Sequence, residues 1–190
     1  VGGVLRTAHE GEIRFVGTDG HRLALADLEV GDSGGDAIEK GIILPRKGLA
    51  ELRKLLDEAE GTAKIRLLGN ALRVEQGDVE LVMRLVDGEF PNYEQVVPDS
   101  TNSRVAVDRG ELCSALRRVS VVASDRARGV RIGLEKNLLK VSASSPDFGE
   151  ASEEIEIKYS GDPINVGFNA RYLTDVLNVL PEDRGVVLGL

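Results

Sequence analysis

A polar, ionisable turn joins two apolar runs in the sequence Phe15-Val16-Gly17-Thr18-Asp19-Gly20-His21-Arg22-Leu23. Asp-Gly between such runs predicts a tight β-hairpin, because the turn needs a positive φ that Gly adopts without strain. Ile13, Phe15, Leu23 and Leu25 recur at alternate positions, as in antiparallel strands. The Thr, His and Arg exceed what a turn requires, so the stretch is either a solvated tip or a polar rim beside a pocket or interface.

Composition limits the classes of protein that this chain can represent. The 190 residues are 42% hydrophobic, which is enough for one large core or two modest ones. One cysteine excludes an internal disulfide and a cysteine-cluster metal site, and two separated histidines do not have metal-ligand spacing. No apolar run approaches the length of a membrane span, and the first residues lack the features of a signal peptide. The single cysteine favours a cytosolic setting, so we expect a cytoplasmic protein. A net charge of −8 argues against coating nucleic acid with the whole surface, but allows a local basic face.

After the hairpin, the first half of the chain predicts strand 42–44, a helix from 46 to about 58, and strands 64–68, 71–76 and 79–86. Leu49, Leu52, Leu55 and Leu56 form the apolar stripe of that helix. Its charges run against the helix macrodipole, with basic residues at the start and acidic residues at the end. This order indicates either scattered surface charge or a surface for an anionic partner. Residues 87–98 contain two prolines and no periodicity, and therefore predict a domain boundary.

The second half predicts strand 104–107, a helix from Asp108 to about Ala123, strands 130–134, 138–144, 151–159 and 164–168, a helix after Asn169, and a strand from Gly185. Asp108 and Glu111 have the spacing of a capping-box variant. We expect the α+β class, with helices on one face of antiparallel sheets.

The two halves also repeat one another. A shift of about 125 residues lays Ile13–Val16 on Leu138–Val141, and a shift of about 124 lays the apolar stripe of the first helix on that of the last. The second copy begins near Ser103 with a strand and a helix that have no counterpart in the first copy. The first copy ends with strands at 71–86 that have no counterpart in the second. We therefore expect the chain to be an internal segment of a longer protein.

Five motifs carry a resemblance to a known family: Thr18-Asp19-Gly20-His21-Arg22-Leu23, Pro45-Arg46-Lys47-Gly48, Leu85-Val86-Asp87-Gly88-Glu89-Phe90-Pro91-Asn92-Tyr93, Arg128-Gly129-Val130-Arg131 and Gly167-Phe168-Asn169-Ala170-Arg171-Tyr172-Leu173. In order and spacing they resemble the bacterial DNA polymerase III beta subunit, the sliding-clamp family. The resemblance implies tandem clamp domains with helices on one face, the pore side, of antiparallel sheets. It assigns residues 1–92 to most of the middle domain and residues 93–190 to most of the last domain.

The resemblance also implies a function without catalysis or cofactors. Members of the family form a homodimeric ring around duplex DNA, which tethers the replicative polymerase without reading sequence, and no membrane is involved. Basic residues on or beside the predicted helices would then face the DNA, namely Arg46, Lys47, Arg53, Lys54, Arg117, Arg118 and Arg171. Val121 and Val122 correspond to the apolar patch that meets the neighbouring subunit, or else belong to the ordinary core.

A hydrophobic groove that takes short extended peptides from polymerases, the clamp loader and repair proteins is the family's second site. The resemblance assigns eleven residues to it, namely Val1, Thr18, Gly20, His21, Arg22, Leu23, Pro91, Gln95, Val96, Asn169 and Tyr172. Gln95 departs from the family, in which a basic residue is common at this position.

Two rival functions remain open from the sequence. An enzyme would use Asp19 and His21 as an acid–base pair with Arg22 holding an anion, although no nucleophile motif or phosphate loop accompanies them. A protein-interaction module without DNA binding would use the hairpin alone. The second copy of the repeat has neither His nor Arg after the strand that matches the hairpin, at Ala143-Ser144-Ser145-Pro146. The surplus polar chemistry is therefore specific to the first copy.

Overall fold

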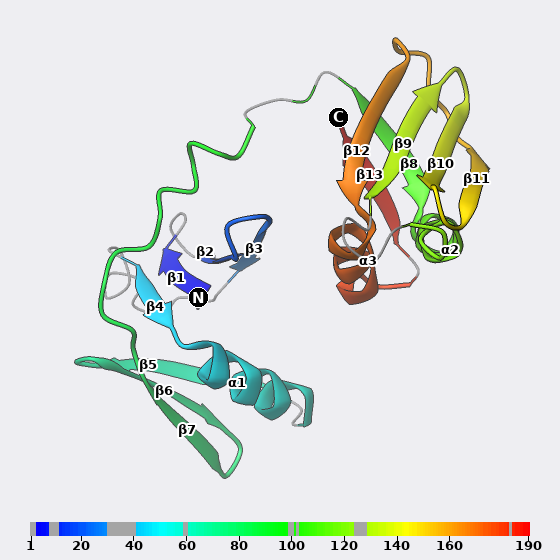
Figure 1. Cartoon of the computed structure of the whole chain (residues 1–190). Helices are drawn as coiled ribbons and strands as arrows, with labels where there is room; N and C mark the ends of the chain where they lie inside the picture. Colours follow the sequence, from blue (N-terminus) through cyan, green and yellow to red (C-terminus); the bar gives the residue numbers. More distant parts are fainter. Residues whose placement is uncertain are drawn as a thin grey trace. The chain divides into compact units, whose positions relative to one another are not determined.

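The computed structural model describes residues 3–7, 12–29, 41–58, 61–98, 101, 103–123, 129–182 and 184–190. The chain divides into two compact units, Val1–Glu94 and Gln95–Leu190, each of which is described by itself (Figure 1). Among the described helices, none has the length and apolar character needed to cross a membrane.

The described residues of the first unit form two antiparallel sheets and one helix. Its elements are β1 (Gly3–Thr7), β2 (Glu12–Thr18), β3 (Leu23–Glu29), β4 (Ile42–Leu44), α1 (Arg46–Glu58), β5 (Lys64–Leu68), β6 (Ala71–Gln76) and β7 (Val79–Arg84). One sheet has the order β3-β2-β1-β4 and the other the order β5-β6-β7 (Figure 1). The hairpin is confirmed, with Thr18 paired to Leu23. Strand β1 was not predicted, because its five residues GVLRT show no clear alternation.

The core of the first unit lies between α1 and the strands. Leu52 of α1 is buried with Leu72 and Val74 of β6, on which buried and half-buried residues alternate. The predicted apolar stripe of α1 is confirmed at Leu52 but is wrong at Leu56, which is 45% exposed. Leu56 lies within the stripe but near the end of α1 at Glu58, one turn beyond Leu52.

The second unit has the elements β8 (Arg104–Asp108), α2 (Arg109–Val119), β9 (Gly129–Glu135), β10 (Leu138–Ser145), β11 (Gly149–Glu156), β12 (Ile164–Asn169), α3 (Ala170–Val179) and β13 (Gly185–Gly189). Strand order is β11-β10-β9-β12 in one sheet, and β13 pairs with β8 in the other. Helix α2 packs on α3 and on the strands, and contributes Leu112 and Leu116 to a core that also holds Leu139 and Val141 of β10.

Both helix caps predicted for this unit are confirmed. The Asp108 side chain accepts a hydrogen bond from the Glu111 backbone N–H at 2.8 Å, and the Asn169 side chain accepts one from the Arg171 N–H at 3.0 Å. The end predicted for α2, near Ala123, is wrong, because the helix stops at Val119. The backbone N–H groups of residues 121–123 donate to the carbonyls three residues earlier, so that a tighter 3₁₀-type turn replaces the last α-helical turn.

The internal repeat appears in the topology. Strands β3, β2, β1 and β4 occupy the same places in their sheet as β11, β10, β9 and β12 in theirs, and a helix follows the last strand in each case. The expected shift in β2 is wrong by one residue. Phe15 packs on the core and therefore matches the buried Val141, whereas the expected shift pairs it with the exposed Lys140. The α+β class, with helices packed on antiparallel sheets, is confirmed.

Candidate functional site

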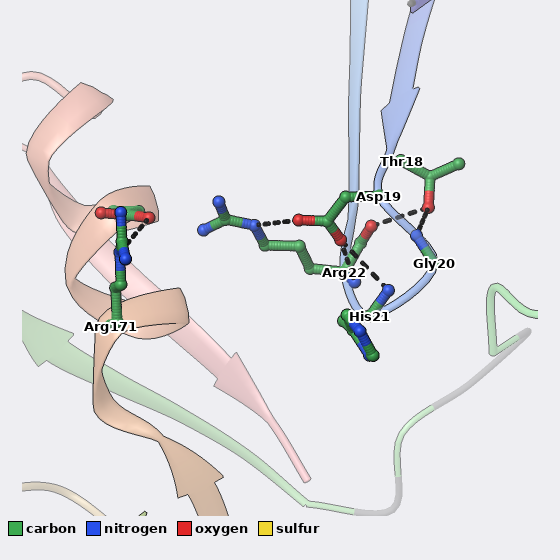
Figure 2. Close-up of polar contacts among 7 residues, drawn as sticks. Thr18, Asp19, Gly20, His21, Arg22 and Arg171 are labelled. Atoms are coloured by element: carbon green, nitrogen blue, oxygen red, sulfur yellow. Dashed lines mark hydrogen bonds and ion pairs between the residues drawn. The ribbon is translucent and has the colours of Figure 1, made fainter. Parts of the chain in front are cut away.

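The turn between β2 and β3 is held by its own polar side chains. The Asp19 carboxylate accepts hydrogen bonds from the backbone N–H groups of His21 and Arg22 through Oδ1, each at 3.1 Å, and from the Arg22 guanidinium through Oδ2 at 3.1 Å. Thr18 Oγ1 donates to the Arg22 carbonyl at 2.8 Å and accepts from the Gly20 N–H at 3.2 Å (Figure 2). Gly20 has φ of +86°, as the turn requires. This network presents His21 and Arg22 at an exposed, ordered tip.

The same network explains Asp19 without catalysis. The His21 backbone N–H, followed by the N–H and guanidinium of Arg22, lowers the pKa of the Asp19 carboxyl. A general base works best with a pKa near the operating pH. Hydrogen bonds within the turn shift the pKa of Asp19 away from that range. In the part of the chain that the structure describes, no group of three or more His, Cys, Asp or Glu side chains could hold a metal ion.

The apolar neighbours of the turn lie on the adjoining strands. Leu23 is half-buried and packs, together with Phe90, against the buried Val16 and Tyr93. The Phe90 and Tyr93 rings meet edge to face, with 6.5 Å between their centroids. Pro91, which the resemblance assigns to the peptide groove, is exposed two residues before Tyr93. The structure thus brings Leu23 and the segment that carries Pro91 to the same face of one sheet.

The other residues that the sequence assigns to the peptide groove either belong to the second unit or lie outside the described ranges. Gln95 and Val96 are exposed, and Val96 reaches 69%. Asn169 caps α3, and Tyr172 lies half-buried on its first turn. Val1 lies outside the described residues. The assignment of these eleven residues to one groove therefore stays a prediction.

The predicted DNA-facing residues differ in how their charges are used. Arg53 Nε lies 3.6 Å from Asp57 Oδ2, and Lys54 Nζ lies 3.0 Å from Glu51 Oε1. Arg171, shown in Figure 2, places its Nε 3.9 Å from Asp175 Oδ2. Arg117 donates to the Asn178 side chain at 2.6 Å, and Arg118 forms a two-point ion pair with Glu153.

Arg46 and Lys47 are different. Both are exposed at the start of α1, and neither makes an ion pair or side-chain hydrogen bond with any residue of the described ranges. The first turn of α1 holds no acidic residue and its last turn no basic one, so the reversed charge order is confirmed. These two charges remain available to an anion, which the sequence could not show because it does not reveal ion pairing.

The two valines assigned to a subunit interface follow α2. Val121 is 77% exposed, and Val122 is half-buried against the core of the second unit. An exposed β-branched residue beside a partly buried one fits the edge of a contact surface. Their role at an interface stays a prediction.

Two tandem copies of one α+β unit, with helices packed on antiparallel sheets and an exposed basic helix start, define the class of clamp-type domains. Comparisons with known proteins identify the family. The family model for the DNA polymerase III beta subunit, central domain, matches residues 1–92, and that for the C-terminal domain matches residues 94–188. The chain belongs to the DNA polymerase III beta subunit family.

Similar proteins agree with this assignment. The chain is 38% identical over 182 residues to a beta sliding clamp of Pseudomonas aeruginosa, covering 96% of this chain and 49% of that protein. It is 35% identical over 178 residues to the beta sliding clamp of Escherichia coli K12, covering 94% and 48%. A crystal structure of the P. aeruginosa sliding clamp bound to griselimycin superposes with a TM-score of 0.91 at 37% identity, covering 100% of this chain and 50% of that one. The chain thus spans about half the length of the relatives it matches.

Proposed function

We propose that the protein is a processivity factor: a non-catalytic sliding clamp that encircles duplex DNA and tethers the replicative polymerase. The observation that carries the proposal is the family match, which extends over both units from residue 1 to residue 188. Residues 1–92 then form the middle domain and residues 93–190 the last domain. Because the matched relatives are bacterial, the bacterial cytoplasm is the expected compartment.

The charge distribution supports contact with DNA through the helices. The whole chain carries −8, yet Arg46 and Lys47 place two positive charges at the start of α1 that have no ion-pair partner within the described ranges. Contacts of this kind would go to phosphates, which are the same for every sequence, and would therefore permit sliding. We propose that Arg46 and Lys47 supply most of the phosphate contact from α1. Arg53 and Lys54, which are already paired within the helix, would supply less.

The hairpin turn supports a second role as part of a peptide-binding site. Its tip is ordered by hydrogen bonds, and the apolar Leu23 lies beside exposed polar groups. An apolar anchor with a few oriented polar groups suits an extended peptide. We propose that the turn, Pro91 and the assigned residues of the second unit bind short peptides from the polymerase, the clamp loader and repair proteins. Val121 and Val122 would serve the subunit interface of a homodimeric ring.

Primer extension tests the proposal. The replicative polymerase of the same organism copies a primed circular template with the clamp loader and ATP, with or without the full-length protein, under conditions that allow one polymerase binding event. The proposal predicts much longer products when the protein is present. Equal product lengths would contradict it. They would favour an interaction module without DNA binding if a polymerase-derived peptide still bound.

A further inference from the structure

The sheet β11-β10-β9-β12 has one face in the core of the second unit and one face turned to solvent. On β9, residues 130, 132 and 134 belong to the core, whereas those at 129, 131 and 135 are exposed. The solvent face carries a hollow of about 850 Å³, within the range of about 300–1,000 Å³ that is typical of ligand sites. All of its lining residues belong to these strands, so the hollow lies within one unit.

Arg131 lies in the middle of this hollow, among residues with little or no side chain. Across the sheet, Arg131 pairs with Gly167 of β12 and with Ser142 of β10. Along β9, its neighbours on the same face are Gly129 and Gly133. The Arg131 side chain is exposed and makes no ion pair or side-chain hydrogen bond with any other residue that the structure describes. Its guanidinium is therefore open to a ligand that enters the hollow.

Carboxylates lie on β11, at the margin of the same face. Glu154 Oε1 is 3.8 Å from Lys140 Nζ, and Ser144 Oγ donates to Glu150 Oε1 at 3.5 Å. The charge of Lys140 is thus matched, whereas that of Arg131 is not matched within the described ranges. This pattern is complementary to a single carboxylate at the centre. A chain of phosphates would also meet Glu150 and Glu154, which repel it.

A peptide segment with one acidic side chain has the chemistry that this hollow requires. A guanidinium binds a planar carboxylate through two parallel N–H donors. The glycines beside Arg131 allow a peptide backbone to approach the sheet closely. Ser142 and Ser152, which pair across β10 and β11, add hydroxyl groups that can donate to or accept from its peptide groups.

The hollow extends to Asn169, where β12 ends and α3 begins. Asn169 and Gly167 lie on the same face of β12, and Gly167 pairs with Arg131. We propose that the hollow extends the peptide-binding site, and that Arg131 binds the carboxylate of an Asp or Glu that flanks the peptide motif of a partner protein. This inference rests on the proposed function, which assigns Asn169 to the peptide groove.

The test measures the Kd of fluorescent peptides for the full-length protein. The core peptide has the pattern Gln-Leu-x-Leu-Phe, and two extended peptides carry one Glu, joined through a short Gly-Ser linker, before or after the core. Matched peptides carry Gln in place of that Glu. We expect one of the two Glu peptides to bind about three- to tenfold more tightly than its Gln match. The absence of any such gain in the wild type would overturn the proposal.

Arg131→Gln should abolish the gain and leave the Kd of the core peptide unchanged, which also shows that the variant is folded. The matched control is Arg104→Gln, which removes the same charge from an exposed position on β8, in the other sheet of this unit. It should keep the gain. A gain that persists in Arg131→Gln, or one that is also lost in Arg104→Gln, would contradict a specific site.

Gly167→Val tests the hollow itself and leaves Arg131 in place. A Cβ at Gly167 meets no atom within 4 Å, so the valine enters the hollow without a clash and should remove the gain. An unchanged gain would overturn the proposal.

Two further results are informative about the ligand. Arg131-dependent binding of a labelled single-stranded oligonucleotide, with no gain from Glu, would assign the hollow to phosphates and overturn the proposal. If the core peptide does not bind the wild type, the proposed peptide site is wrong and its extension falls with it. If the core binds but Glu gives no gain, only the extension is wrong.

Discussion

Neutralising Arg46 and Lys47 should reduce the salt dependence of DNA binding more than any other double change on α1. Binding to duplex DNA weakens with salt because each phosphate contact releases counterions, with a slope of about −0.9 in log K against log salt per contact. Two lost contacts therefore flatten the slope by about 1.8. When salt rises from about 50 to about 200 mM, the affinity of the double variant should therefore fall about 12-fold less than that of the wild type.

The control is on the same helix. Arg53→Gln with Lys54→Gln removes the same charge as Arg46→Gln with Lys47→Gln, but Arg53 and Lys54 already lie 3.6 and 3.0 Å from Asp57 and Glu51. We expect a clearly smaller change of slope for this control. All four side chains are exposed, so neither double variant should lose its fold.

The assay is fluorescence anisotropy of a labelled duplex, titrated with the full-length protein at several salt concentrations. Equal slopes for the two double variants would show that net charge alone decides binding. An unchanged slope for the Arg46 and Lys47 variant would show that these side chains are only solvated. Either result would refute the reasoning from ion pairing.

Three other predictions follow from the two units. Leu52→Ala should destabilise the first unit by about 2–5 kcal/mol, because it leaves a cavity among Leu72, Val74 and Met83. Leu56→Ala, at an exposed position, should lower the free energy of unfolding far less. Denaturant unfolding monitored by hydrogen exchange compares the two variants. The pKa of the Asp19 carboxyl is lowered in the folded turn, so the ionised carboxylate should stabilise the turn at any pH above the ordinary Asp pKa of about 3.9. This stabilisation should be lost as the pH falls through the lower pKa of the folded state. NMR titration of the His21 amide should thus give a midpoint below about 3.9, and a midpoint at or above it would contradict the hydrogen-bond account. Leu23→Asp or Tyr172→Asp in the full-length protein should weaken binding of a polymerase-derived peptide without unfolding either unit, since both side chains are only half-buried; unchanged titrations would refute their assignment to the groove.

Local chemistry in the sequence predicted most elements of the fold. The Asp-Gly turn, the Asp108 and Asn169 caps and the strand at 71–76 all follow from short-range rules, and the structure confirms them. Features that depend on partners distant in sequence were missed. Strand β1 is defined by pairing with β2 and β4, and the register of the repeat depends on which face of β2 meets the core.

The same limit applies to the candidate site. The sequence singled out the Thr18–Leu23 turn, because its polar residues exceed what a turn needs. Composition also could not reveal that Arg53 and Lys54 are paired while Arg46 and Lys47 have no ion-pair partner among the described residues, because ion pairs depend on side-chain geometry.

A clamp that is topologically linked to DNA can leave it only past a free end, so release on linearisation tests the proposed function. The labelled full-length protein is loaded onto nicked circular DNA with its clamp loader and ATP, separated from free protein by gel filtration, and followed before and after a single cut linearises the DNA. A sliding clamp remains with the circle and is lost from the linear product, because it slides off the ends. Equal retention on circular and linear DNA, or no retention on either, would contradict the account.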